Sequence, residues 1–202
     1  MTTLYYHPYS QHSRRVIALL EEAGLPYELE KVALEDGAHT SSEYLRINPN
    51  HQVPTLVDGA VRIHESNAIL RYLCGQHRLT GWYPEDPMLR ATVDQWLDWN
   101  QCRLSPSVID VVLNKVFLGD DGDQAAIERG EKNLVELLAI LESGLADSDF
   151  LAGDEPTIAD LSVASNVFQL SFADAAPSGD NTSKWFSKVM QIEGFRKSLP
   201  QQ

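Results

Sequence analysis

Residues 50–59 read Asn-His-Gln-Val-Pro-Thr-Leu-Val-Asp-Gly, and residues 64–70 read His-Glu-Ser-Asn-Ala-Ile-Leu. The first stretch is typical of a short apolar strand that enters through a proline and leaves through an Asp-Gly turn. Proline cannot donate to a sheet, so Pro54 suggests a tight entry in which the Val53–Pro54 bond can be cis and the Val53 backbone stays free. In the second stretch, Ser66 is expected to cap a helix that presents unpaired amides and the positive end of its dipole. Together the two stretches predict a cradle for a peptide backbone and a carboxylate.

The elements around this cradle form a recognisable order. Apolar and polar residues alternate over 27–32, and apolar residues recur with helical spacing over 13–23. The predicted elements are a strand at 3–6, a helix at 13–23, a strand at 27–32, a short helix at 41–45, the strand from Pro54, a strand ending at Ile63 and a helix at 66–77. A βαβ unit followed by a hairpin and a helix is the thioredoxin-like order. The segment 78–87 holds Gly81, Pro84 and Pro87 and is typical of a linker.

Beyond this linker the pattern is helical and contains no convincing strand. Helices are predicted over 89–104, 107–118 and 125–141, and Pro106 can start or bend the second of them. Thr157 and Asp160 have the spacing of a capping box, in which each side chain binds the backbone amide of the other residue. We interpret Asp160 as a structural residue of an all-helical second domain.

Composition excludes several classes of partner. The chain has 202 residues, 43% of them apolar, and a net charge of −13. Nucleic acids and anionic membranes bind basic patches, which this chain does not concentrate anywhere, so neither is expected as a partner. No apolar run approaches a membrane span, and the N-terminus is too polar for a signal peptide. With two cysteines, Cys74 and Cys102, and no C-x-x-C motif, a reducing cytoplasmic location is expected.

A family resemblance rests on three features of the sequence, which are Val53–Pro54, Glu65–Ser66 and Ser10 far upstream. Over nearly its whole length the chain resembles the cytosolic glutathione transferases, and its opening is similar to the serine-type theta and delta members. The resemblance implies a thioredoxin-like glutathione-binding domain at 1–78, a linker at 79–87 and an all-helical domain at 88–202 that carries the acceptor site. It also implies a homodimeric detoxification enzyme that uses glutathione as co-substrate and transfers it to small, mostly apolar electrophiles.

The same resemblance assigns residues to each part of glutathione. Glu65 is expected to bind the ammonium group. Ser66, with its amide at the helix start, is expected to bind the γ-glutamyl carboxylate. The Val53 backbone is expected to pair with the cysteinyl peptide, as an added strand would. His39 lies nine residues before Asn48 and has the spacing at which theta-type members bind the glycyl carboxylate. The amide of Gln52 can add a contact, although His51 departs from the Gly, Lys or Arg that many members carry before it.

The sulfur requires a group that stabilises its anion, because a free thiol ionises near pH 8.5 and is mostly neutral at pH 7. Ser10 is the predicted catalytic residue, since it has the spacing of the family serine and can donate to a thiolate. Ser13, one turn further on, and Tyr6, at the position of the phenol in tyrosine-type members, are the alternatives; His12 is a weaker one. Neither cysteine lies near this helix start, so exchange through an enzyme disulfide is not expected.

The acceptor site is less defined by the sequence. Tyr9 and His12 from the first loop, and Trp99, Arg103 and Ser107 from the first helices after the linker, are the candidates, whereas Trp96 is interpreted as a core residue. The six histidines are scattered without ligand spacing and no phosphate-binding loop is present, so neither a metal nor a nucleotide is expected. Two other functions use the same fold: a non-catalytic binding or regulatory module, and a glutathione-dependent peroxidase or isomerase.

Overall fold

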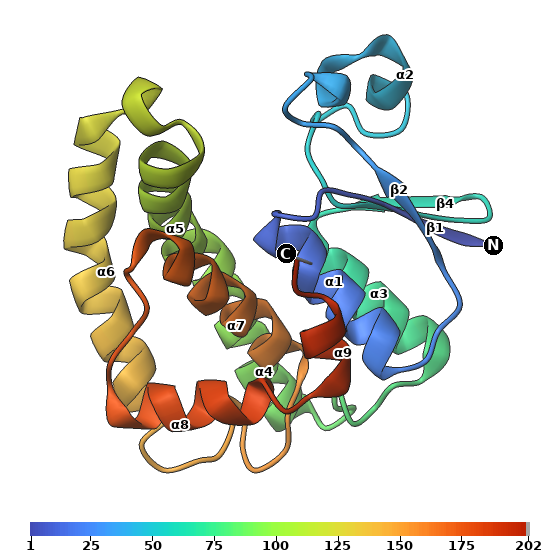
Figure 1. Ribbon diagram of the computed structural model, residues 1–202. Coiled ribbons are helices and arrows are strands. Elements are labelled where there is room, and N and C mark those ends of the chain that lie inside the picture. Colours follow the sequence, from blue (N-terminus) through green and yellow to red (C-terminus); the bar gives the residue numbers. More distant parts are fainter. Residues whose placement is uncertain (201–202) are drawn as a thin grey trace. The chain divides into compact units, whose positions relative to one another are not determined.

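The computed structural model describes residues 1–200, and they divide into two compact units. The first unit comprises Met1–Thr80 and the chain from Gln191 onward, and the second comprises Gly81–Met190. One helical domain was expected over residues 88–202. The difference lies in the last helix, α9 (Glu193–Lys197), which packs on α1 (Gln11–Glu22) of the first unit (Figure 1).

Gly194 allows this close packing of α9. A Cβ atom at this position would lie 2.3 Å from the carbonyl oxygen of Ala18 and 2.4 Å from the nitrogen of Glu22. The amide of Gly194 donates to the Glu22 carboxylate at 2.7 Å. Only a glycine therefore fits at this position against α1. The sequence did not predict this contact, because hydrophobic periodicity does not indicate which helix a short terminal helix packs on.

A four-stranded mixed sheet forms the centre of the first unit, in the order β2-β1-β3-β4. The strands are β1 (Thr2–Tyr6), β2 (Glu28–Lys31), β3 (Thr55–Asp58) and β4 (Val61–His64). Strand β1 runs parallel to β2 and antiparallel to β3, and β3 pairs antiparallel with β4 through the Asp58-Gly59 turn. Helices α1 and α3 (Ser66–His77) lie on one side of the sheet, and α2 (Ser42–Leu45) lies on the other (Figure 1). This is the predicted thioredoxin-like arrangement.

Helix α3 begins at Ser66 itself, with Glu65 at the N-cap position in a backbone conformation of φ 68°. The expectation that Ser66 would be the cap is therefore wrong by one residue. The Glu65 side chain makes no capping hydrogen bond. The first amides of the helix thus receive no side-chain acceptor from the cap residue.

The second unit consists of helices. They are α4 (Pro87–Trp99), α5 (Ser105–Val112), α6 (Gln124–Gly144), α7 (Ile158–Leu170) and α8 (Asp180–Val189), with two π-helical segments, η2 (Asn100–Leu104) and η3 (Leu113–Phe117). The two helices predicted at 89–104 and 107–118 are therefore one continuous helical run. The wider turn of η2 precedes Pro106, whose missing N–H would otherwise interrupt the run.

Helix α7 is the core of the second unit, and 12 of its 13 residues are buried. Asn100 joins it to η2: its amide nitrogen donates to Ser162 Oγ at 2.9 Å, and its amide oxygen accepts from Asn166 Nδ2 at 2.7 Å. Trp96 is 8% exposed, which agrees with its interpretation as a core residue.

The capping box at Thr157 is present as predicted, and Asp160 has additional partners. Its carboxylate accepts from the Thr157 amide at 2.8 Å, from the Leu151 amide at 2.9 Å and from Trp185 Nε1 at 2.8 Å. Burial raises the pKa of this carboxyl, and the hydrogen bonds that it accepts oppose the shift. Asp160 therefore joins α7, the loop before it and α8.

Candidate functional site

Ser10 is the N-cap residue of α1. Its Oγ accepts from the Ser13 amide at 3.2 Å, and its own amide donates to the His7 carbonyl at 3.0 Å. Among residues 1–200 the hydroxyl hydrogen of Ser10 has no acceptor. It is therefore available to donate to a ligand at the N-terminal end of a 12-residue helix, where the helix dipole favours an anion.

Ser13 and Tyr6, the two alternatives to Ser10, lie in different surroundings. Ser13 is completely buried, and its Oγ lies 3.4 Å from the His7 amide nitrogen. Tyr6 is the last residue of β1 and is half-buried. Ser10 is thus the one of the three whose hydroxyl is both partly exposed and at a helix start.

The backbone before β3 has the geometry expected from the sequence. The Val53–Pro54 bond is cis. The carbonyl of Gln52 is held by Tyr44 Oη at 2.7 Å and by Asn48 Nδ2 at 2.9 Å, whereas the Gln52 side chain is exposed. Within the described part of the chain, the N–H and C=O groups of Val53 have no hydrogen-bond partner. A peptide-like ligand could pair with them as a strand does.

Glu65 and Ser66 occupy the start of α3. The Ser66 side chain is 4% exposed, whereas the Glu65 side chain is 59% exposed and lies 3.8 Å from His64 Nδ1. A buried hydroxyl beside uncapped helix amides suits a carboxylate, and an exposed carboxylate next to it suits an ammonium group. The pair therefore matches the α-amino acid end of a peptide.

His39 lies in the short 3-10 helix η1 (Ala38–Thr40). Its Nδ1 atom is buried and has no hydrogen-bond partner among residues 1–200. Buried polar atoms are usually hydrogen-bonded in folded proteins, so this nitrogen is suited to a hydrogen bond with a ligand.

The five acceptor candidates fall in both units. Tyr9 is 44% exposed in the loop before α1. His12, at the second position of α1, has its pKa lowered to about 3, first by burial and then by the charge of Arg15. In the second unit, Trp99 packs edge-on against Trp96 with ring centroids 5.1 Å apart. Arg103 and Ser107 line a pocket of about 290 Å³ against α6.

This pocket has a charged lining. Asp110 and Arg129 face it, and their side chains form a two-pronged ion pair with distances of 2.9 Å and 3.0 Å. Glu136 and Asn133 also contribute. Such a lining suits a polar ligand better than the apolar acceptor that was expected there.

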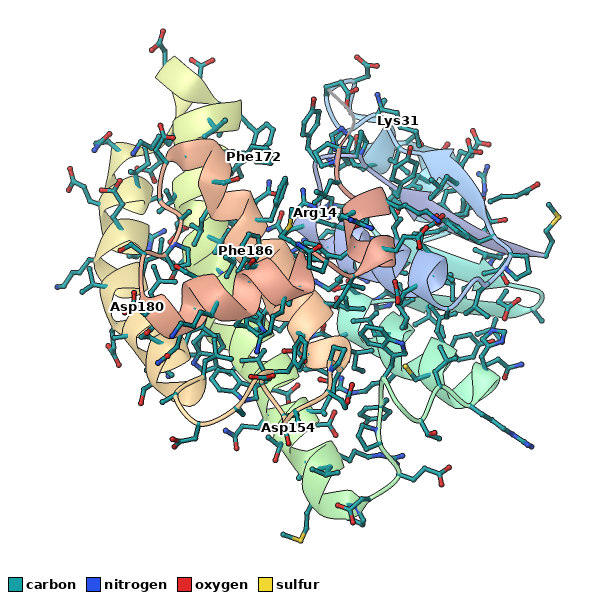
Figure 2. All side chains as sticks on the ribbon, turned by 60° about the horizontal axis from the view of Figure 1, so that its bottom comes forward. Arg14, Lys31, Asp154, Phe172, Asp180 and Phe186 are labelled. Atoms are coloured by element: carbon teal, nitrogen blue, oxygen red, sulfur yellow. The ribbon has the colours of Figure 1, made fainter. Side chains whose placement is uncertain are left out.

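An exposed apolar cluster of the second unit was not identified from the sequence. Phe172, in the 3-10 helix η5 (Ser171–Ala173) that follows α7, packs edge-on against Phe168 and Phe117, with centroids 5.4 Å and 6.5 Å away (Figure 2). Phe117 is 47% exposed, and Leu113 and Leu118 beside it along the chain are 42% and 45% exposed. The surplus of apolar residues at the end of the predicted 107–118 helix was the available signal. We call Phe117, Phe168 and Phe172 the phenylalanine cluster.

Within residues 1–200, no three histidine, cysteine, aspartate or glutamate side chains gather closely enough to hold a metal ion. None of the helices that the structure describes is both long and apolar enough to cross a membrane.

Comparison with known proteins identifies the family. Residues 1–75 match the model of the glutathione S-transferase N-terminal domain, and residues 124–186 match that of the C-terminal domain. Glutathione S-transferase F10 of Arabidopsis thaliana is 36% identical over 80% of this chain and 77% of its own length, and glutathione S-transferase GstB of Escherichia coli is 30% identical over 98% and 97%. The crystal structure of glutathione transferase F2 from Populus trichocarpa has a TM-score of 0.88 at 31% identity, over 98% and 97% of the two chains. The chain belongs to the cytosolic glutathione S-transferase family.

Proposed function

We propose that the protein binds glutathione along the first unit and activates its thiol for attack on small electrophiles. The observation that carries the proposal is the Ser10 hydroxyl: it accepts from the Ser13 amide and has a hydrogen left to donate. The Val53 backbone would pair with the cysteinyl residue of glutathione, Glu65 and Ser66 would bind its γ-glutamyl end, and His39 Nδ1 would bind its glycyl carboxylate. Gln52, whose side chain is exposed, would add an amide contact.

One hydroxyl and one helix N-terminus can supply the free energy that is needed to stabilise the thiolate. Lowering the thiol pKa by about two units requires roughly 2.7 kcal/mol of preferential stabilisation of the thiolate. A hydrogen bond to a charged group supplies about 1.5 to 3 kcal/mol, and a helix N-terminus about 0.3 to 1 kcal/mol more. No base on the protein is required, because the thiol proton can leave to water and the serine remains a donor.

The thiolate then forms a bond from its sulfur to an electrophilic carbon, and the leaving group departs with the electron pair of the broken bond. We propose that the phenylalanine cluster of the second unit binds apolar compounds, the class to which the expected acceptors belong. Its three rings are edge-to-face and partly exposed, which offers an apolar surface that the charged pocket around Arg103 lacks. Peroxide reduction and isomerisation would use the same thiolate.

Glutathione binding is the first test. Calorimetry is expected to give a dissociation constant between micromolar and low millimolar, as for a small charged peptide held by a few polar contacts. Glu65→Ala should weaken binding by about three- to tenfold, since the ammonium loses a carboxylate that is largely in solvent. Glu28→Ala, which removes an exposed carboxylate on β2, is the matched control and should bind as the wild type does. No heat at several millimolar glutathione would instead favour the non-catalytic function.

We also propose a homodimer, the common form of soluble oligomers. Exposed apolar side chains on α4 and α6 support it, with Met88 82% exposed, Leu89 48% and Val135 75%. Light scattering should report about twice the chain mass of 22.6 kDa. Met88→Glu should shift the protein toward the monomer without changing its circular dichroism spectrum, because the side chain contacts little in the isolated chain. A monomeric wild type at micromolar concentration would contradict the proposal.

A further inference from the structure

The imidazole of His7, immediately after β1, makes two hydrogen bonds. Its Nδ1 accepts from the Tyr9 amide at 3.3 Å, and its Nε2 lies 3.1 Å from a carboxylate oxygen of Glu35. A backbone amide only donates and a carboxylate only accepts, so one nitrogen must carry a lone pair and the other a hydrogen. Neutral histidine with the hydrogen on Nε2 satisfies both bonds at once.

The backbone of His7 holds the same loop. Its carbonyl accepts from the Ser10 amide at 3.0 Å, and Pro8 has no amide hydrogen. The amides of Tyr9 and Ser10 therefore both donate to His7, that of Tyr9 to the ring and that of Ser10 to the carbonyl. The position of the Ser10 hydroxyl depends on the conformation of this turn. The hydrogen bond to the ring of His7 is one of the two that the amides of the turn donate to His7.

Glu35 connects this turn to the loop that carries His39. That loop is closed on itself, because the amides of Asp36 and Ala38 donate to the Ala33 carbonyl at 3.2 Å and 3.0 Å. The second carboxylate oxygen of Glu35 accepts from Lys31 at 2.8 Å, at the end of β2 (Figure 2). Lys31 is the main reason that the pKa of Glu35 is lowered to about 2, so Glu35 is ionised and accepts from His7 at any physiological pH.

We propose that His7 is a positioning residue for glutathione activation. Through Tyr9 it holds the turn that presents Ser10 to the sulfur, and through Glu35 it ties this turn to the loop that presents His39 to the glycyl end. The inference rests on the proposed function, since it assigns His7 to the site that binds glutathione. Its chemistry is that of a neutral hydrogen-bond relay, and His7 itself does not touch the reacting sulfur.

Three variants separate the two hydrogen bonds of the His7 ring. His7→Ala removes both of them. The carboxamide of His7→Asn reaches about as far as Nδ1 and can accept from Tyr9, whereas that of His7→Gln reaches about as far as Nε2 and can donate to Glu35. Lys31→Met is the matched control, because it removes a charge next to Glu35 and leaves the bond from His7 in place.

The first readout is the pKa of bound glutathione, from the ultraviolet absorbance of its thiolate. His7→Ala should raise it by about half a unit to one unit and lower kcat at pH 7 by roughly 1.5- to threefold, because the Ser10 hydroxyl is displaced. KM for glutathione should rise by about two- to fivefold, because the loop that carries His39 loses its hydrogen bond through Glu35. His7→Asn should restore the thiol pKa. His7→Gln should not restore it.

The second readout is the preference for glutathione over γ-glutamylcysteine, which lacks the glycyl carboxylate. This preference should fall by about two- to fivefold in His7→Ala and be retained in His7→Gln, because only the latter keeps the tie to Glu35. Lys31→Met should behave as the wild type in both readouts. A purely structural role would instead lower the melting temperature of the His7 variants without separating Asn from Gln.

The outcomes distinguish this inference from the function on which it rests. If the wild type forms no glutathione thiolate, the proposed function and the role of His7 are both overturned. If Ser10→Ala shifts the thiol pKa and His7→Ala does not, only the role of His7 is overturned. The same holds if His7→Asn and His7→Gln give identical values.

Discussion

Ser10→Ala is expected to raise the pKa of the glutathione thiol in the complex by about one to two units, equivalent to losing roughly 1.4 to 2.7 kcal/mol of thiolate stabilisation. The Ser10 hydroxyl has a hydrogen with no acceptor among residues 1–200, and the variant removes that donor from the start of α1. At pH 7 the thiolate fraction, and turnover with it, should fall by a factor of roughly 3 to 25, while glutathione affinity barely changes. Titration of the thiolate absorbance in the ultraviolet measures the shift directly.

Two hydroxyl deletions are the controls for this experiment. Tyr6→Phe should leave the titration nearly unchanged. Ser13→Ala should change it little, because Ser13 is completely buried and its Oγ faces the His7 amide. An unchanged titration in Ser10→Ala with a shifted one in Tyr6→Phe would reverse the assignment of the catalytic hydroxyl. A shift in Ser13→Ala alone would place that hydroxyl one turn further along α1.

Asp160→Ala is expected to lower the free energy of unfolding by about 3 to 5 kcal/mol. One carboxylate oxygen accepts from Leu151 and Trp185, and the other accepts from the amide and hydroxyl of Thr157, at distances between 2.8 Å and 3.0 Å. The variant leaves these buried donors without an acceptor. Urea unfolding should show a lower midpoint at an unchanged slope.

The controls test whether the lost hydrogen bonds cause the effect. Asp160→Asn keeps one acceptor oxygen, so it can satisfy the donors of one side and opposes those of the other with its own N–H groups. Its destabilisation should be roughly half that of Asp160→Ala. Asp154→Ala removes an exposed carboxylate ahead of the same helix (Figure 2) and should stay within about 0.5 kcal/mol of the wild type. Equal loss in Asp160→Asn and Asp154→Ala would contradict the assigned role.

Local signals in the sequence predicted most of the architecture. The alternation and helical spacing of apolar residues placed the strands and helices of the first unit, and the capping box at Thr157 placed the start of α7. These features are decided within a few residues of the chain, so sequence is enough to read them. The bounds of α3 were predicted correctly, but its cap was misplaced from Glu65 to Ser66, because capping depends on backbone torsion, which the residue type alone does not specify.

Site geometry was less accessible, because it depends on which atoms remain unpaired after folding. Sequence spacing left Ser10, Ser13 and Tyr6 as alternatives, and burial of Ser13 separates two of them. The residues assigned to glutathione stay predictions, but the unpaired Val53 backbone and the buried Nδ1 of His39 are observations that no pattern of residues contains.

By itself, the sequence determined the order of strands and helices, the cis-capable proline before β3 and the family to which the chain belongs. The tertiary structure alone decided that α9 returns to α1, that the phenylalanine cluster forms from η3, α7 and the turn that follows it, and that His7 connects the turn before Ser10 to Glu35. The physical reason is the sequence separation over which each kind of interaction acts. Local backbone preferences act over a few residues, whereas the contacts of His7 with Glu35, of Phe117 with Phe172 and of α9 with α1 join residues 28 to 172 positions apart. Only the folded chain brings the atoms of these residues into contact.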